Sequence, residues 1–356
     1  MKRFIQIFTA IAGISCMVWA CQPKDNYVKI TGFAQGGTYS VTANMKGVQG
    51  MIKMTPQELK ENIDSILLSV DNSLSGYNKS SELTQFNEGK IIKPSLIFKD
   101  IYRKSYNIYI QTDSIVDVAS APLFDAWGFG FKSGEMPTDE IVDSLKSSCG
   151  LKYLHKDIDS RLLSDGSLIP SALLKNLEQE IEPSLNFNSV AQGYSCDIVV
   201  DYLKRLGIKD MMVDIGEIFC QGLNSKGKNW TIAIDTPSDN NNNPGADICG
   251  IFIAPKTPCG IVTSGNYRKF YVRDGKKYAH TIDPRTGRPV EHNLLSATVI
   301  AKDGFTADAL ATYCMVVGLD ESMNFIENNK DVEACLVYSE NGEFHTWQSS
   351  GFVMRK

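Results

Sequence analysis

The chain has few of the features that mark a zinc finger, a disulfide scaffold or a nucleic-acid-binding surface. Its nine cysteines include no Cys-x-x-Cys pair. Those beyond Cys21 are scattered and odd in number, so they predict neither a zinc site nor a disulfide framework, and we expect small buried apolar residues instead. The net charge of −5 argues against a nucleic-acid surface. No repeat period is present, and there are only four histidines.

The first twenty residues have the form of a secretory leader. Met1-Lys2-Arg3 is basic, and the apolar run that follows is too short and too interrupted for a membrane span. Ala20 and Cys21 then resemble the lipobox of bacterial lipoproteins. We expect Cys21 to carry lipid and to anchor the protein at a membrane, facing the periplasm, with the inner membrane favoured over the outer. The alternatives are lipidation at Cys16, a plain signal peptide or an uncleaved anchor.

The remaining chain is long enough for one large domain or two intimate ones. We expect residues 1–20 to be the signal peptide, 21–30 a tether and 31–356 the functional domain. Strand and helix patterns alternate irregularly, so the fold class is predicted to be α+β rather than a doubly wound parallel sheet.

Apolar spacing and capping signals place the expected elements. Thr55 is expected to cap the first helix, with Pro56 at its first position. Thr306 is expected to be the N-cap of a later helix that stops at Gly318. The predicted helices are 55–70, 98–112, 191–206, 306–318 and 321–328, and the predicted strands are 28–33, 38–43, 185–190, 211–216, 230–234 and 251–254.

Two short motifs suggest chemistry. In "TADALAT", Asp308 and Thr312 lie four residues apart, hence on one helix face, and such an oxygen pair suits Mg²⁺. In "NSVAQGYS", Asn188, Ser189 and Gly193 lie at a predicted strand-to-helix turn, where N–H groups favour an anion and Gly193 permits a phosphate to approach. Taken alone, each motif is also explained by helix capping or by an ordinary turn.

The stretch "YAHTIDPRTGRPVEH" contains two of the four histidines. Asp283 to Gly287 reads as a tight turn, because proline presets φ and glycine supplies a positive φ. His280 is placed to act as a general base, and Arg285 and Arg288 to hold phosphate. The alternative is a packed histidine and solvated arginines. His292 has no assigned role.

Taken together, these motifs resemble the ApbE-type lipoproteins, the FAD:protein FMN transferases. The resemblance covers the chain from about Gly32 to its end. It is carried, in order, by "SLSGYNKSSELTQFN", "DVASAPLFDAWGFG", "NFNSVAQGYSCD", "VDIGE", "IVTSGNYRKFY", "HTIDPRTGRPVEHN" and "TADALAT".

This resemblance implies a single large ApbE-like domain, related to the T-fold, with mixed or antiparallel sheets and flanking helices. It implies Mg²⁺ as cofactor and FAD as substrate, with His280 important for catalysis. The implied metal ligands are the carbonyl of Ala191 and the side chains of Asp308 and Thr312. The implied FAD-binding residues are Gly36, Tyr77, Ala121, Pro122, Leu123, Asn188, Tyr194 and Ile282.

The resemblance also implies transfer of FMN from FAD to a threonine of an acceptor redox protein, with release of AMP. N–H groups at the start of the Ala191 helix would take up phosphate oxygens, Tyr77 would flank the isoalloxazine ring, and His280 would accept the threonine proton. Two alternatives stay open: an FAD pyrophosphatase giving FMN and AMP, and a non-catalytic flavin-binding lipoprotein.

Overall fold

The computed structural model describes residues 26–48, 54–130, 136–154, 156–168, 183–239, 241, 245–267, 270–273 and 276–355. The expected signal peptide and the expected lipid site, Cys21, lie outside these residues. Within them, no helix has both the length and the apolar character needed to cross a membrane. Residues 27–30 of the expected tether, 21–30, belong to a paired strand.

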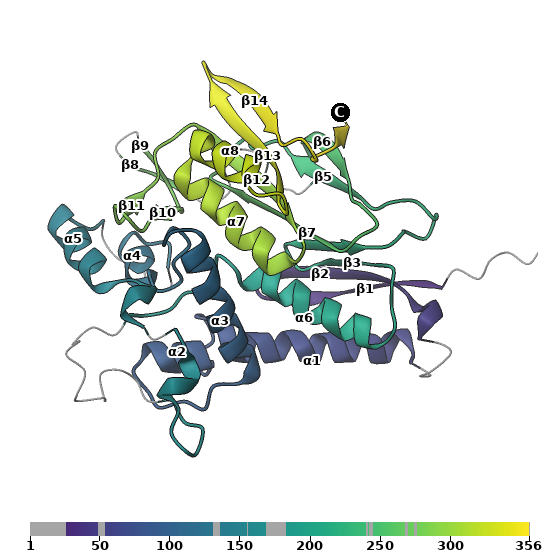
Figure 1. The fold of residues 1–356 in the computed structure, drawn as a ribbon, viewed down its shortest axis with the longest axis horizontal. Helices are drawn as coiled ribbons and strands as arrows, with labels where there is room; N and C mark the ends of the chain where they lie inside the picture. The colour runs from purple at the N-terminus through teal and green to yellow at the C-terminus, as the bar shows by residue number, and fades with distance from the viewer. Residues whose placement is uncertain are drawn as a thin grey trace, which may run out of the picture.

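An eight-stranded antiparallel sheet forms the centre of the molecule (Figure 1). Every neighbouring pair in it is antiparallel, which confirms the predicted α+β class. In spatial order its strands are β1 (Tyr27–Ala34), β2 (Gly37–Asn44), β3 (Met211–Asp214), β4 (Ile218–Gln221), β7 (Cys259–Gly265), β12 (Leu294–Ala301), β13 (Glu333–Glu340) and β14 (Glu343–Gln348).

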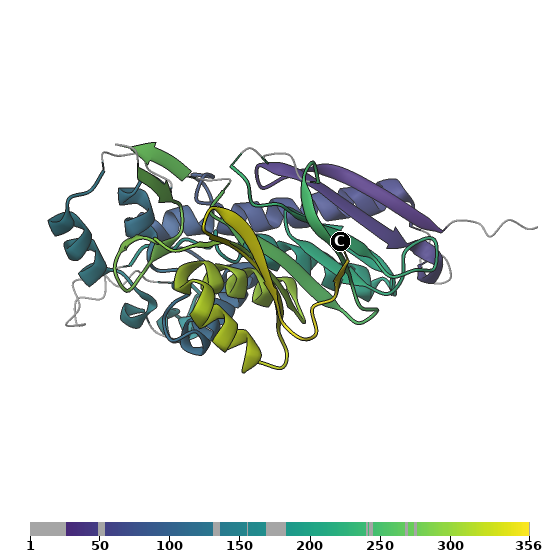
Figure 2. The same cartoon turned by 90° about the horizontal axis from the view of Figure 1, so that it is seen from above.

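Helices cover one face of this sheet and a small second sheet covers the other (Figures 1 and 2). Apolar side chains of β1–β4 pack against α1 (Pro56–Leu74) and α6 (Ala191–Arg205). Next to them, α7 (Gly304–Val317) packs against β7 and β12, with α8 (Leu319–Glu327) beside it. The second sheet contains β15 (Met354–Arg355), β6 (Ile248–Ile253) and β5 (Thr231–Asp235), whose apolar side chains share a core with the central strands.

A helical region lies at one end of the molecule, at the left of Figure 1. Its core is continuous with that of α7 and β12, so the described part of the chain folds around shared hydrophobic packing. Two short hairpins lie beside this region. The elements here are α2 (Glu82–Asn87), α3 (Leu96–Gln111), α4 (Ala121–Ala126), α5 (Asp139–Ser148), the 3₁₀ turns η2 (Leu151–Tyr153) and η3 (Ile158–Arg161), and the strands β8 (Phe270–Arg273), β9 (Lys276–Ala279), β10 (Ile282–Asp283) and β11 (Arg288–Pro289); a further turn, η1 (Met45–Gly47), follows β2.

Most predicted elements are confirmed, with ends shifted by a few residues. Helix α1 begins as expected: the Thr55 hydroxyl accepts from the Glu58 N–H at 3.2 Å, and the Glu58 carboxylate accepts from the Thr55 N–H at 2.7 Å. This reciprocal arrangement is a capping box, which satisfies backbone donors at the helix start.

Two predictions of local structure were wrong. The N-cap of α7 is Asp303 rather than Thr306, because the Asp303 carboxylate accepts the Thr306 N–H at 2.8 Å. Residues 185–190 are not a strand. The side chain of Asn186 accepts the Asn188 N–H at 2.9 Å, and such a local turn competes with a β ladder.

Candidate active site

A cavity of about 290 Å³ lies where the helical region meets the central sheet. Its wall is built from the loop after α1, the segment before and after α4, the start of α6, the end of β7, the loop around β10 and one face of α7. The predicted site residues that line it are Tyr77, Asn188, His280, Ile282, Asp308 and Thr312.

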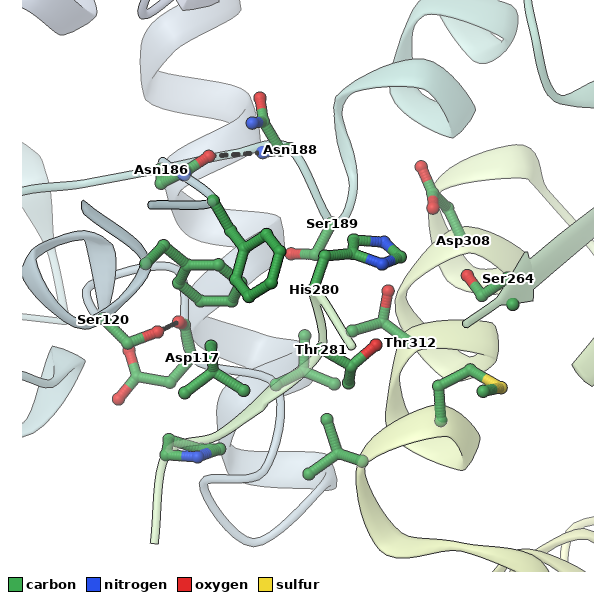
Figure 3. A pocket seen from close by; sticks show the side chains of 18 of the residues that line it. Asp117, Ser120, Asn186, Asn188, Ser189, Ser264, His280, Thr281, Asp308 and Thr312 are labelled. Atoms are coloured by element: carbon green, nitrogen blue, oxygen red, sulfur yellow. Dashed lines mark hydrogen bonds between the residues drawn. The ribbon is translucent and has the colours of Figure 1, made fainter. Parts of the chain in front are cut away.

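Figure 3 shows how the polar side chains face one another across this cavity. His280 lies centrally, with Asp308 and Thr312 on one side and Asp117 and Ser120 on the other. The i, i+4 spacing of Asp308 and Thr312 on α7 brings both to the cavity wall.

Asp308 is almost fully buried, being 5% exposed. Its Oδ2 accepts the N–H of Gly193 at 3.0 Å, so a carboxylate of α7 caps the first turn of α6. Asp197 of α6 returns this contact, accepting the N–H groups of Gly304 and Phe305 at 2.7 and 2.9 Å. The two helices therefore cap each other, and this fixes the position of Asp308 relative to the start of α6.

Burial has the largest effect on the pKa values of Asp197 and Asp308. It raises the pKa of Asp197 to about 7, with the nearby charge of Asp303 adding to the rise. Burial also raises the pKa of Asp308. The hydrogen bond from the Gly193 N–H lowers this pKa, and the charge of Asp197 raises it. A nearby cation would lower both pKa values by favouring the ionised forms.

The oxygen atoms around Asp308 fit a hard cation. Among the described residues no basic side chain forms an ion pair with Asp308. Thr312 adds a hydroxyl to the same cavity wall. The Ala191 carbonyl, which accepts the Ser195 hydroxyl at 2.6 Å at the first position of α6, is not among the groups that line the cavity. No group of three or more acidic, histidine or cysteine side chains that could by itself hold a metal ion occurs in the described part of the chain. Such a sparse oxygen set suits Mg²⁺, which keeps several ligands from substrate and water.

The expected role of Gly193 needs correction. Its N–H is already taken by Asp308, and the Ala191 N–H donates to the carbonyl of Phe187 at 2.8 Å, so neither is left to bind a phosphate. Gly193 instead lets two helices touch. A Cβ atom there would lie 2.2 Å from the carbonyl oxygen of Gly304 and 2.8 Å from the Asp308 Cβ.

Replacing Gly193 with alanine is therefore expected to force α6 and α7 apart. We expect the free energy of unfolding to fall by about 3 kcal/mol, as in overpacked cores, although alanine favours helices over glycine by about 1 kcal/mol. Urea unfolding followed by circular dichroism measures the change. Gly37→Ala is the control, because nothing lies within 4 Å of the added atom; equal stability of the two variants would contradict the close contact.

His280 lies between β9 and β10 and lines the cavity. The next residue fixes its loop, since the Thr281 hydroxyl donates to Asn266 Oδ1 at 2.8 Å. The predicted turn follows: the Gly287 N–H donates to the Asp283 carbonyl at 2.7 Å, and Gly287 has a φ of +71°. The turn therefore joins β10, which follows His280, to its partner strand β11.

The two arginines of this stretch do not line the cavity. Arg285 forms an ion pair with Asp283 at 2.9 Å, and Arg288 forms one with Asp139 at 2.8 Å. Arg285 therefore pairs within the turn and Arg288 links the turn to α5, so the prediction that they hold phosphate in the cavity is not supported. His292 also lies elsewhere: its Nε2 donates to the carbonyl of Met315 at 2.9 Å, near the end of α7.

Other predicted FAD contacts lie away from the cavity wall. Gly36 belongs to the exposed β1–β2 turn, where Gln35 and Gly36 both have positive φ, as in a type I′ hairpin. Tyr194 is 3% exposed and donates to Asp100 Oδ2 at 2.9 Å. The ring of Tyr194 packs against Phe305, with 6.4 Å between ring centroids, so it faces the core between α3, α6 and α7.

The segment Ala121–Leu123 is also turned away. Ala121 and Leu123 are buried, whereas the residues of this region that line the cavity are Ser120 and Phe124. The same short helix explains both facts, because positions four apart share a face and the positions between them point elsewhere. This helical spacing within "DVASAPLFDAWGFG" is the signal that would have found the lining residues.

Several further cavity residues were missed. They belong to motifs that carried the family resemblance, but no individual role pointed to them: Asp117, Ser120, Phe124, Phe129, Asn186, Gln192, Glu217, Thr263, Ser264, Gly265 and Tyr267. Asp117 stands out because it is a half-buried acid. Its Oδ1 accepts the N–H groups of Ala119 and Leu151 at 2.8 and 3.1 Å, which links the segment before α4 to the 3₁₀ turn η2.

Burial raises the pKa of Asp117 to about 6 from 3.8. Between these pH values the unfolded chain releases the proton while the folded protein keeps it, so ionisation costs stability as pH rises. We expect Asp117→Asn, which keeps the acceptor oxygen, to be more stable than wild type by about 1–3 kcal/mol at pH 8 and equal to it near pH 4. Thermal unfolding at several pH values measures the difference; a constant difference across this range would contradict the raised pKa.

The described cysteines are all free, and all except the half-buried Cys249 are buried. This confirms that the cysteines beyond Cys21 do not form a disulfide framework. Burial also raises the pKa of the thiols, as for Cys149, Cys259, Cys314 and Cys335 at about 12. They are therefore packing residues rather than reactive groups.

Comparison with known proteins places this geometry in a family. A model of the ApbE family matches residues 36–336. An FAD:protein FMN transferase of Haemophilus influenzae is 30% identical over 359 residues, covering 99% of this chain and 98% of that protein. An FAD:protein FMN transferase of Escherichia coli K12 is 33% identical over 315 residues, covering 86% of this chain and 84% of that protein.

Solved structures agree in fold. Flavin transferase ApbE from Vibrio cholerae superposes with a TM-score of 0.73 at 30% identity, covering 91% of this chain and 97% of that chain. The apo form of Pseudomonas stutzeri flavinyl transferase ApbE gives a TM-score of 0.75 at 29% identity, covering 91% and 95%. The likeness thus extends over nearly the whole of each chain.

Proposed function

The chain belongs to the ApbE family, and we propose on this basis that it is an FAD:protein FMN transferase that uses the cavity around His280 and Asp308. The observation that carries the proposal is the meeting of three groups in one cavity. A general-base candidate, His280, faces an oxygen pair, Asp308 and Thr312, although His280 and Asp308 are 28 positions apart in the sequence.

The reaction is substitution at the FMN phosphorus of FAD. The hydroxyl oxygen of an acceptor threonine forms a bond to phosphorus, the bond from phosphorus to the bridging oxygen breaks, and AMP leaves with that oxygen. His280 accepts the hydroxyl proton as the new bond forms. Because negative charge spreads over the phosphoryl oxygens, positioning and electrostatic stabilisation supply most of the rate.

Asp308, Thr312 and the Ala191 carbonyl are the groups that would hold Mg²⁺. When bound there, the ion supplies positive charge to the pyrophosphate. Asn188 and Ser189 lie at the adjacent turn before α6 and line the same cavity, so they are placed to contact phosphate or ribose hydroxyls. Tyr77, which is 72% exposed, stands at the cavity mouth, where its ring can cover one face of the flavin.

The proposed cellular location of the reaction rests on the N-terminal sequence. A lipid on Cys21 would hold the enzyme at a membrane surface facing the periplasm, with the inner membrane favoured. The acceptor would then be a redox protein subunit exposed on the same side. Treatment of cells with an inhibitor of lipoprotein processing, followed by fractionation, tests this: a mature protein that is unchanged in mass and location would overturn the anchor.

The activity itself is tested by incubation with FAD, Mg²⁺ and a protein that carries an accepting threonine. A flavin-fluorescent acceptor band on a denaturing gel, with one AMP released per flavin transferred, is the expected result. AMP and free FMN without a labelled band would indicate an FAD pyrophosphatase, and intact FAD in every reaction would indicate a flavin-binding protein. Acceptor with its threonine replaced by alanine is the control.

A further inference from the structure

Four aromatic rings form a continuous stack beside the cavity, here called the aromatic column: Trp127, Tyr278, Tyr271 and Phe129. Trp127 stacks on Tyr278 with ring centroids 6.0 Å apart and planes inclined by 27°. Tyr278 stacks on Tyr271 at 5.2 Å and 20°. Tyr271 stacks on Phe129 at 5.1 Å and 25°. Each pair lies in the range of favourable aromatic contacts.

The column joins two segments that are distant in sequence. Trp127 and Phe129 follow α4, whereas Tyr271 and Tyr278 face each other across the β8–β9 hairpin. The Trp127 indole N–H donates to the Gly287 carbonyl at 2.8 Å, which ties the column to the turn after β10. His280 directly follows the hairpin and lies three residues before Asp283, where that turn begins, so both the hairpin and the turn flank it along the chain.

The last ring of the column also touches His280 directly. Phe129 and the His280 imidazole have ring centroids 6.4 Å apart and planes inclined by 69°, an edge-to-face contact. Phe129 and His280 line the cavity, but Trp127, Tyr271 and Tyr278 do not. These three rings are therefore not positioned to contact a substrate bound in the cavity.

We propose that the aromatic column positions the His280 imidazole for proton transfer, with Tyr271 and Tyr278 acting as positioning residues through Phe129. The inference rests on the proposed function, in which His280 accepts the acceptor's proton. An imidazole nitrogen must point at the attacking hydroxyl, and a small misplacement of a catalytic group lowers the rate strongly. The edge-to-face contact holds the plane of the imidazole, and stacking on Tyr271 holds Phe129.

Tyr271→Leu tests the column without altering the cavity wall. We expect kcat for AMP release to fall about tenfold while the KM for FAD changes less than about twofold, because orientation rather than binding is lost. Tyr271→Phe keeps the stacking ring and is expected to retain most of kcat. A fall in kcat that is equal for leucine and phenylalanine would overturn the proposal.

A double variant separates positioning from general loosening of the fold. In a His280→Ala background the column has no imidazole to orient, so adding Tyr271→Leu is expected to leave the residual rate unchanged. A further tenfold loss in that background would mean that Tyr271 acts through structure alone and would overturn the proposal. Tyr338→Leu is the matched control, because Tyr338 stacks on a histidine, His345, at 5.6 Å, away from the cavity.

The two proposals fail in different ways. Wild-type protein that releases no AMP from FAD, with or without acceptor, would overturn the proposed function and this inference with it. Wild-type protein that transfers FMN, together with a Tyr271→Leu variant of unchanged kcat, would overturn only the role of the column. Thermal unfolding of each variant confirms that the comparison is made on folded protein.

Discussion

Asp308→Ala is expected to lower the rate of FMN transfer by at least about 1000-fold, equivalent to about 4 kcal/mol of transition-state stabilisation. Asp308 supplies a buried carboxylate of the proposed Mg²⁺ site, and Thr312 supplies only a neutral hydroxyl. Without this carboxylate the ion loses its charged protein ligand. The rate is measured as AMP released from FAD at a series of Mg²⁺ concentrations, and we expect the variant to need far more Mg²⁺ or not to respond to it.

Asp308→Asn distinguishes loss of the metal from loss of the helix contact. Asparagine keeps an oxygen for the Gly193 N–H but removes the charge, so we expect a folded protein that is still strongly impaired. Mn²⁺ binding, followed by electron paramagnetic resonance without FAD, gives a readout independent of turnover. Asp201→Asn, on the exposed side of α6, is the control. Unchanged Mn²⁺ affinity in Asp308→Asn would contradict the assignment.

The sequence predicted those elements whose local signals agree with the tertiary structure. Helix α1 is an example, because its capping box and proline lie in the sequence itself. The N-cap of α7 was misplaced by three residues, since Asp303 and Thr306 are both good N-cap residues and only the observed hydrogen bond distinguishes them. Residues 185–190 have an apolar pattern that resembles a strand, but the Asn186 side chain forms a turn instead.

The candidate site was predictable where helical spacing decided it and unpredictable where packing did. Asp308 and Thr312 lie four apart, so one helix face brings both to the cavity. In contrast, the glycine at position 193 suggested a phosphate contact, whereas its reason is the close approach of Gly304 from another helix. Tyr194 likewise follows the cavity-lining turn but points into the core. No local signal distinguishes these cases, because the hydrogen-bond partner lies 115 residues away in the chain for Gly193 and 94 residues away for Tyr194.

His280→Ala is expected to lower the rate of FMN transfer by about 100-fold or more, the usual contribution of a general base. The loss should appear in kcat with little change in the KM for FAD, because His280 is proposed to act on the acceptor's proton rather than to hold the dinucleotide. His345→Ala, on β14 away from the cavity, is the matched control and should be as active as wild type.

Added imidazole provides the sharpest test of this role. Removing the His280 side chain enlarges the cavity at the point where the base acts, so free imidazole can enter and accept the hydroxyl proton in its place. We expect the rate of His280→Ala to rise with imidazole concentration and to do so more strongly above pH 7, where the neutral base predominates. The His345→Ala control should not respond. A His280→Ala variant that transfers FMN at the wild-type rate would assign proton acceptance to another group or to water.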